Sequence, residues 1–440
     1  MAQSHGIDVT EAVNGARFGS YQFLVVSLCV AIAAFDGYDT QSIGYVAPLI
    51  AKDLGIGMAN LGPIFGAGLV GLTLGAILFG TWADQIGRKW ATLLSILVFA
   101  IFSLATPSAA SFQSMLLIRF LAGVGLGGAL PNVVALTAEY VPARVRGITV
   151  NLVNASFAFG SILGGLISAK VVPVYGWHAV FYIGGVIPLL SLAVFIIWLP
   201  ESLQFLVVKG SASAEIARVL GRVTKRPFAA TARYVLPEAA LTGFSVKHLF
   251  RESRALMTIL LWIAFFMNLL VLLLLIQWLP TLLSQAGLPL EQAILTTVSY
   301  NVGGVIGALI LGRLIDRIGP FIVLVGSFLF TACFIAVAAS SLGNQSVLVA
   351  ALVLAGAGVN GNQASLNTLA SALYQTAIRS TGVGWALGIG RIGAIVGPVL
   401  AGILVAAHWD ARMIIMITIV PNVIAALTIL ILWRTRPGSA

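Results

Sequence analysis

The chain alternates long apolar runs with short polar segments. Each run has about 18 or more residues of low polarity, which is the length a helix needs to cross a bilayer core of about 30 Å. The pattern predicts twelve membrane-spanning helices, at residues 20–46, 60–83, 90–109, 112–138, 149–172, 178–198, 255–284, 291–315, 320–341, 345–372, 380–406 and 410–433.

A polar stretch from Glu201 to Ser253 interrupts this series after the sixth run. We therefore expect an all-α integral membrane protein with two six-helix bundles. The expected parts are a cytoplasmic N-terminus at 1–19, a bundle at 20–198, a cytoplasmic central loop at 199–254, a second bundle at 255–433 and a cytoplasmic C-terminus at 434–440.

The two halves repeat one segment. GAILFGTWADQIGRK, which begins at Gly75, aligns with GALILGRLIDRIGP, which begins at Gly307, at a constant offset of 232 residues. Both copies cover the end of a second helix and the loop after it. The repeat predicts a duplicated, pseudo-symmetric architecture with a substrate path between the bundles.

Composition agrees with lipid as the solvent, because 59% of the residues are hydrophobic and only 9% are charged. The net charge of +10 lies between the apolar runs and not along one stripe, so we expect no nucleic acid partner. Cys29 and Cys333 lie inside apolar runs, and no histidines are paired at ligand spacing, so we expect no metal. Two GxGxxG patterns, at Gly123 and Gly388, fall inside spans, so no dinucleotide or other cofactor is expected, and no enzyme motif is present.

The basic residues set the expected orientation. With both termini in the cytoplasm, the outer loops hold only Lys52, Lys170 and Arg412, as the positive-inside rule requires. Arg119 and Arg391 are left inside predicted spans.

Three segments resemble the major facilitator superfamily. Gly75 to Lys89 is similar to its signature loop, Arg119 to Gly125 (RFLAGVG) to its fourth-span motif, and Pro200 to Ser202 (PES) to the end of its sixth span. The second copy of the signature loop, from Asp316 to Pro320, lacks the basic pair of the first. The resemblance covers essentially the whole chain and implies the fold but no substrate.

Asp36-Gly37-Tyr38-Asp39 in the first span resembles the DGxD motif of the aromatic acid:proton symporters, which carry 4-hydroxybenzoate and related compounds. This resemblance implies multi-pass insertion in a bacterial inner membrane and aromatic acid uptake for catabolism. It also implies functional positions at Asp84, Gly87, Arg119, Glu139, Asp316, Arg379 and Arg391.

The charges inside spans need a reason, because each costs about 2.5–3.5 kcal/mol at the bilayer centre. Asp36 and Asp39 share one helix face toward the outer half of their span, and Arg119 lies at similar depth. Two close carboxylates do not both ionise readily unless a cation compensates them. We expect Asp36, Asp39 and Arg119 to couple protons; the alternative is a static pair that only fixes helix packing.

Arg391 lies near the expected midplane, where its planar fork suits a substrate carboxylate. The alternative is a permanent pair with Asp36 or Asp39. We expect both aspartates at the substrate as well. Aromatic and amide side chains could line the rest of the site, and the candidates are Phe35, Tyr38, Asn132, Asn154, Phe157, Tyr300, Asn301, Asn362 and Trp385.

A separate group is expected to gate the cytoplasmic side. Asp84, Gly87 and Arg88 lie at a helix end, and Glu139 could pair there with Arg144 or Arg146. The second-half members of this group are Asp316 and Arg379. The alternative is ordinary solvation of helix ends.

These features together favour a monomeric, proton-coupled symporter that imports an aromatic carboxylate by alternating access. Its expected partners are the carboxylate, protons and the lipid bilayer. A proton-coupled antiporter that exports drugs or aromatic compounds shares the same features. A ligand sensor without transport would need a soluble output domain, for which the central stretch is too short.

Overall fold

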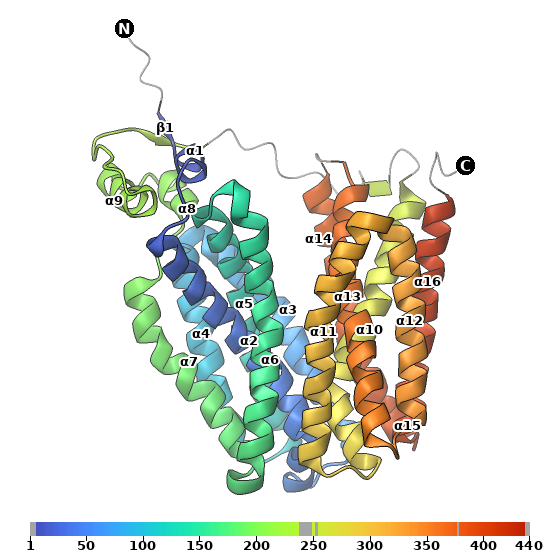
Figure 1. Cartoon of the computed structure of the whole chain (residues 1–440). Coiled ribbons are helices and arrows are strands. Elements are labelled where there is room, and N and C mark those ends of the chain that lie inside the picture. The colour runs from blue at the N-terminus through green and yellow to red at the C-terminus, as the bar shows by residue number, and fades with distance from the viewer. Residues whose placement is uncertain (1–5, 237–248, 251–253, 376–377, 436–440) are drawn as a thin grey trace.

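The computed structural model describes residues 6–236, 249–250, 254–375 and 378–435. Within these residues, 12 helical segments are long and apolar enough to cross a membrane (Figure 1). The twelve expected spans are therefore confirmed.

The N-terminal half follows a short strand and helix, β1 (Ile7–Asp8) and α1 (Val9–Asn14). Its six spans are α2 (Ser20–Asp53), η1 with α3 (Met58–Asn60, Leu61–Ile86), α4 with η2 (Arg88–Ala105, Thr106–Ser108), α5 (Phe112–Tyr140), α6 (Ala143–Tyr175) and α7 (His178–Trp198).

The C-terminal half has its own six spans. They are α10 (Ala255–Gln285), α11 (Leu290–Ile318), α12 (Pro320–Ser340), α13 (Gln345–Leu373), α14 (Arg379–Ala406) and the pair α15 and α16 (Ala411–Ile417, Ile419–Arg434).

The stretch that we expected to be a loop contains regular structure, so that expectation was incomplete. It forms α8 (Leu203–Val208), α9 (Ser213–Thr224) and β2 (Tyr234–Val235), and β2 pairs in parallel with β1. Ile216, Leu220 and Val223 recur at helical spacing in α9 and are buried. Burial of this apolar face fixes α9 on the N-terminal half.

The duplication is visible in how glycines let helices approach. A Cβ on Gly160 of α6 would lie 1.9 Å from the carbonyl oxygen of Ala34 in α2. A Cβ on Gly393 of α14 would lie 2.2 Å from the carbonyl oxygen of Phe266 in α10. The same pair of helices therefore touches backbone to backbone in each half, at equivalent positions of the repeat.

The repeated loop also has one backbone conformation in both copies. Gly87 ends α3 with φ 96°, and Gly319 ends α11 with φ 97°. L side chains rarely adopt this region, which explains the glycine in each copy.

The halves meet at the end of the molecule away from both termini (Figure 1). The largest buried apolar cluster draws on both halves, with Tyr45, Leu61 and Trp177 from one and Trp278 and Ile294 from the other. A second cluster joins the N-terminal half to α1, α8 and α9, and a third lies wholly within the C-terminal half. Hydrophobic contact between the halves is thus concentrated on the side opposite the termini.

Candidate functional site

Asp39 and Arg119 form a buried ion pair inside the N-terminal half. Arg119 Nη2 donates to Asp39 Oδ2 at 2.7 Å and Nη1 donates to Oδ1 at 3.2 Å. Ser103 Oγ adds a 3.4 Å contact to Oδ1, and the guanidinium lies 5.4 Å from the ring centroid of Phe181. The bidentate geometry balances both charges locally and ties α2 to α5.

Asp36 lies one turn earlier on α2, is 3% exposed, and has a different environment. Its only hydrogen bond in the described part of the chain comes from Thr40 Oγ1 at 3.2 Å, and it forms no ion pair within 4 Å there. Electrostatic attraction reaches it from Arg391 on α14, in the other half. Asp36 is therefore a buried carboxyl group without a direct counter-ion.

The depth of the two aspartates in the membrane stays a prediction. Because α2 continues to Asp53, Asp36 and Asp39 lie near the middle of this helix.

Arg391 lies near the middle of α14 and is partly exposed. Among the described residues it makes no hydrogen bond and no direct ion pair, so a permanent contact with Asp36 or Asp39 is absent. Its neighbours Gly390 and Gly393 pack on Phe265 and Phe266 of α10. This leaves a guanidinium at the junction of the halves with its donors free.

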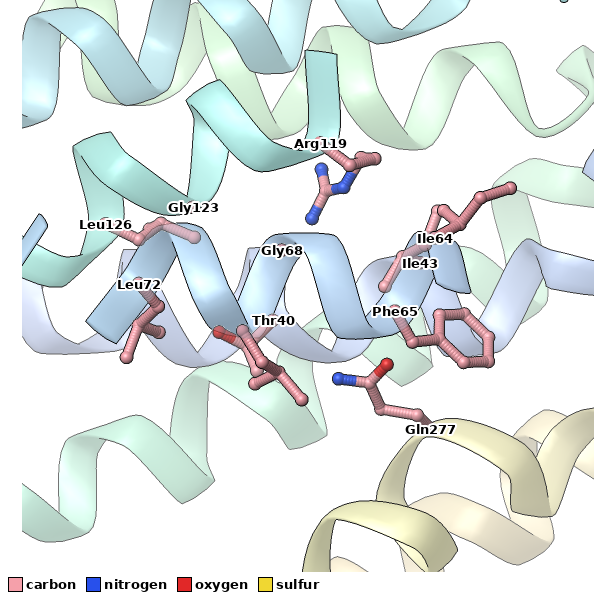
Figure 2. Close-up of a pocket in the computed structure, with 11 residues that line it drawn as sticks. Thr40, Ile43, Ile64, Phe65, Gly68, Leu72, Arg119, Gly123, Leu126 and Gln277 are labelled. Carbon is pink, nitrogen blue, oxygen red and sulfur yellow. The ribbon is translucent and has the colours of Figure 1, made fainter. Parts of the chain in front are cut away.

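A small cavity beside Arg119 joins the two halves (Figure 2). It measures about 20 Å³, which is room for one water molecule. Thr40 and Arg119 contribute polar atoms from the N-terminal half and Gln277 from α10, and the Oε1 atom of Gln277 has no hydrogen-bond partner in the described structure. The hydroxyl that binds Asp36 thus also lines this cavity.

Apart from this cavity, direct hydrogen bonds join the two halves. The side-chain amide of Gln41 donates to the carbonyl oxygen of Ile276 across the junction. Asn301 Nδ2 donates to the hydroxyl of Tyr45 at 3.3 Å, and that hydroxyl donates to the carbonyl oxygen of Ser161 at 3.0 Å. Asn301, expected at the substrate, is therefore engaged in closing the molecule.

Several other expected lining residues are used inside the N-terminal half. The Tyr38 hydroxyl donates to the carbonyl oxygen of Val180 at 2.9 Å, so it fixes α7 and is not free for a substrate. Asn132 and Asn154 each donate to the carbonyl oxygen four residues earlier in their own helices, and Asn154 is exposed. The carbonyl oxygen of Phe157 lies where a Cβ of Gly37 would be, so α6 and α2 are in backbone contact there.

The C-terminal half holds polar groups without partners. Asn362 is fully buried, and neither its Nδ2 nor its Oδ1 has a hydrogen-bond partner among the described residues; the same holds for the Tyr300 hydroxyl. Trp385 is 46% exposed and stacks on Trp262 with centroids 5.9 Å apart. Unpaired buried polar atoms are unusual in proteins and point to a ligand or a second conformation.

Sequence reasoning missed Asn268. Adding the repeat offset to Asp36 leads to this residue, which occupies the position of Asp36 in the second half. Asn268 is 1% exposed, its Nδ2 donates to Gln363 Oε1 at 2.9 Å, and its Oδ1 has no partner in the described chain. The offset was the signal that could have identified it.

Two of the expected gating residues, Arg88 and Glu139, form one network. Glu139 pairs with Arg88, and Ser202 Oγ donates to Glu139 Oε2 at 2.6 Å. The expected pairing of Glu139 with Arg144 or Arg146 was wrong. Arg144 Nη2 instead donates to the carbonyl oxygen of Ala16 at 3.1 Å, and Arg146 Nη2 to Asn14 Oδ1 at 2.9 Å.

Glu201 caps the start of α4 next to this network. Its Oε1 accepts the backbone N–H of Lys89 at 3.1 Å and that of Ser202 at 2.8 Å. Burial raises the pKa of Glu201 above its ordinary value, and these two hydrogen bonds oppose the shift. The carboxylate also lies where a Cβ of Gly87 would be, a second reason for glycine there.

Asp84, Asp316 and Arg379 are exposed at helix ends on the terminus side. Neither aspartate forms an ion pair within the described residues. The network around Glu139 therefore ties α4, α5 and α8 within one half and does not bridge the halves.

Twelve spans in two repeated bundles, with unpaired charges at their junction, define a polytopic membrane transport protein. The chain belongs to the family described as the Major Facilitator Superfamily, whose sequence profile matches residues 29–374 and, in a second match, 287–440.

Two similar proteins are named as transporters of aromatic acids. The chain is 36% identical to the 4-hydroxybenzoate transporter PcaK of Acinetobacter baylyi over 98% of this chain and 95% of that protein. It is 37% identical to a gallate transporter of Pseudomonas putida over 96% and 94%. The predicted resemblance to aromatic acid carriers is thereby confirmed.

Solved structures share the fold. The xylose transporter XylE from E. coli superposes with a TM-score of 0.73 at 16% identity, covering 95% of this chain and 98% of that one. A bacterial homologue of the lysosomal transporter Spinster superposes with a TM-score of 0.76 at 17% identity, again covering 95% of this chain and 98% of that one.

Proposed function

We propose that the protein is a proton-coupled symporter that imports a hydroxybenzoate-like carboxylate by alternating access. The observation that carries this proposal is the pair of unpartnered charges at the junction, Asp36 and Arg391, which attract each other without touching. The related 4-hydroxybenzoate and gallate transporters supply the substrate class.

Charge balance couples the two ligands. When Asp36 is ionised, it offsets Arg391; when Asp36 carries a proton, a substrate carboxylate takes its place beside the guanidinium. A proton without the anion, or the anion without the proton, leaves one net charge at low dielectric. Such a charge costs about 2.5–3.5 kcal/mol, which disfavours the uncoupled forms on the order of a hundredfold.

The two ends of the substrate require different groups. Arg391 offers a planar fork that holds both carboxylate oxygens. Asn268 lies within a turn of the contact between α10 and α14, and its free Oδ1 accepts a ring hydroxyl. In this proposal the side chains of Asn362 and Tyr300 reorient toward the aromatic ring once the substrate is bound.

The proposed orientation has both termini in the cytoplasm, because the basic residues then lie inside. The contact through Gln41, Tyr45 and Asn301 closes the outer side, so this conformation faces inward. In the outward-facing state we propose that Asp84 and Asp316 reach basic groups of the opposite half, with Arg379 at the start of α14 as one of them.

Uptake into proteoliposomes with an acidic exterior tests the proposal. We expect labelled 4-hydroxybenzoate to accumulate, and a collapsed pH gradient to prevent accumulation. Extrusion of the acid against its gradient in exchange for protons would instead identify an exporter.

Arg391→Lys keeps the charge but loses the fork, so we expect at least a tenfold weaker affinity for 4-hydroxybenzoate, measured by thermal stabilisation of the detergent-solubilised protein. Arg412→Lys, on the exposed first turn of α15, serves as the control and should bind like the parent. Equal affinity in the Arg391 variant would remove this residue from the site.

A further inference from the structure

A second cavity lies away from the junction of the halves, on the side of the N-terminal half that faces away from the C-terminal half. It measures about 430 Å³ and lies between the terminus-side ends of α4 and α7 and the helices α8 and α9. Figure 1 shows α8 and α9 over the terminus-side end of this half, beyond α7. The transport site does not use this cavity.

Positive charge dominates its walls. The cations that line it are Lys89, Lys209, Arg218 and Arg222, and the acids are Glu201 and Glu215. Glu201 is already engaged by the backbone N–H groups of Lys89 and Ser202. The cavity therefore carries an excess of positive charge, with one carboxylate already satisfied.

Two of these cations, Lys209 and Arg218, remain available to a ligand. The buried apolar face of α9 docks on the bundle, which directs its other face to the cavity. Arg218 has no hydrogen bond or ion pair within the described residues, and Lys209 Nζ lies 5.1 Å from the ring centroid of Phe205, with no carboxylate in reach there. Arg218 and Lys209 are both exposed.

The rim of the cavity is the lipid-facing end of two spans. Trp90 at the start of α4 is 54% exposed, Ile197 near the end of α7 is 75% exposed, and Trp198 is 52% exposed. Tryptophans at span ends mark the level of lipid head groups. A ligand in this cavity thus has basic groups around its head and apolar side chains below it.

We propose that this cavity binds the phosphate head group of an anionic phospholipid, with Lys209 and Arg218 as its main contacts and its acyl chains along α4 and α7. Basic pockets at the end of membrane helices suit such head groups, because charge attraction and acyl-chain burial act together. A soluble phosphate ion would gain the charge attraction but not the burial of acyl chains.

The test measures binding of phosphatidylglycerol to the purified protein by native mass spectrometry, with phosphatidylcholine, whose zwitterionic head group has no net charge, as the comparison. Lys209→Gln with Arg218→Gln removes two charges near the lipid surface, and we expect about thirtyfold weaker phosphatidylglycerol binding. The matched control is Arg313→Gln with Arg434→Gln, two exposed cations at the terminus-side ends of α11 and α16, which should bind the lipid like the parent.

Three results would overturn the proposal. The first is equal phosphatidylglycerol binding by the double variant and the parent. The second is equal binding of phosphatidylcholine and phosphatidylglycerol by the parent. The third is displacement of the lipid by millimolar inorganic phosphate, which would assign the cavity to a soluble anion.

Discussion

Asp36 and Asp39 differ in what neutralises them, although they lie one turn apart on α2. Asp39 has two hydrogen bonds from the Arg119 guanidinium, at 2.7 and 3.2 Å. Asp36 accepts one hydrogen bond from the Thr40 hydroxyl, and the cation that attracts it, Arg391, is not in direct contact. Removal of one partner from a buried pair costs about 3–5 kcal/mol, so Asp39 suits a structural role and Asp36 suits proton exchange.

Asp36→Asn is expected to abolish uphill accumulation of 4-hydroxybenzoate and to retain exchange of labelled for unlabelled acid. The amide imitates the protonated carboxyl group, which leaves Arg391 to the substrate but releases no proton. Counterflow and ΔpH-driven uptake in proteoliposomes separate the two activities. Glu291→Gln, an exposed carboxylate on α11, is the control; full accumulation in Asp36→Asn would exclude this residue as the proton site.

Asn268→Leu is expected to weaken the binding of 4-hydroxybenzoate and to leave the binding of benzoate unchanged. A lost hydrogen bond to a buried group costs about 1–3 kcal/mol, or roughly 5- to 150-fold in affinity. Thermal stabilisation by each acid measures the difference. Equal weakening of both acids would mean that Asn268 supports the helix and does not contact the ring hydroxyl.

The sequence located the charged residues but not their partners. Hydropathy exposes an arginine or aspartate inside a span, so Asp36, Asp39, Arg119 and Arg391 could be predicted. Pairing depends on the approach of helices distant in sequence, and for this reason Glu139 was assigned to the wrong arginine.

Close helix pairs are the elements that keep each half rigid. In α6, Gly160 touches the backbone of α2, whereas Gly147 has nothing within 4 Å of an added Cβ. We expect Gly160→Ala to lower the free energy of unfolding by about 1–3 kcal/mol, as other overpacked sites do. Gly147→Ala in the same helix is the matched control, and thermal unfolding in detergent compares them; equal melting temperatures would contradict the packing described for α2 and α6.

Local hydropathy is also why the spans were predicted well and their ends poorly. A span is evident in about twenty consecutive residues, whereas hydropathy does not fix where its helix ends: α2 continues to Asp53, past the predicted end at residue 46. The short helix α9 left a weaker signal, the spacing of Ile216, Leu220 and Val223, in a stretch that is polar on average.

At the scale of the whole molecule, the two halves share a backbone plan but not their charges. The repeat offset places Asn268 opposite Asp36 and Val271 opposite Asp39. In the same comparison, with the helix register shifted by one residue, Leu352 matches Arg119 and Ala158 matches Arg391. In the proposed mechanism, proton exchange is therefore confined to the N-terminal half, and the cation that binds the substrate anion lies in the C-terminal half. Under this proposal we expect one proton to be transported with each carboxylate.

Proton influx measured alongside substrate influx tests this charge balance most directly. Proteoliposomes with a pH-sensitive dye inside receive a 4-hydroxybenzoate gradient while valinomycin sets the membrane potential to zero or to a negative value, and protein-free vesicles correct for passive entry. We predict one proton for each acid molecule and a rate that does not change with the potential. A rate that rises with a negative interior, or fewer than one proton for each acid, would contradict coupling through Asp36 and Arg391.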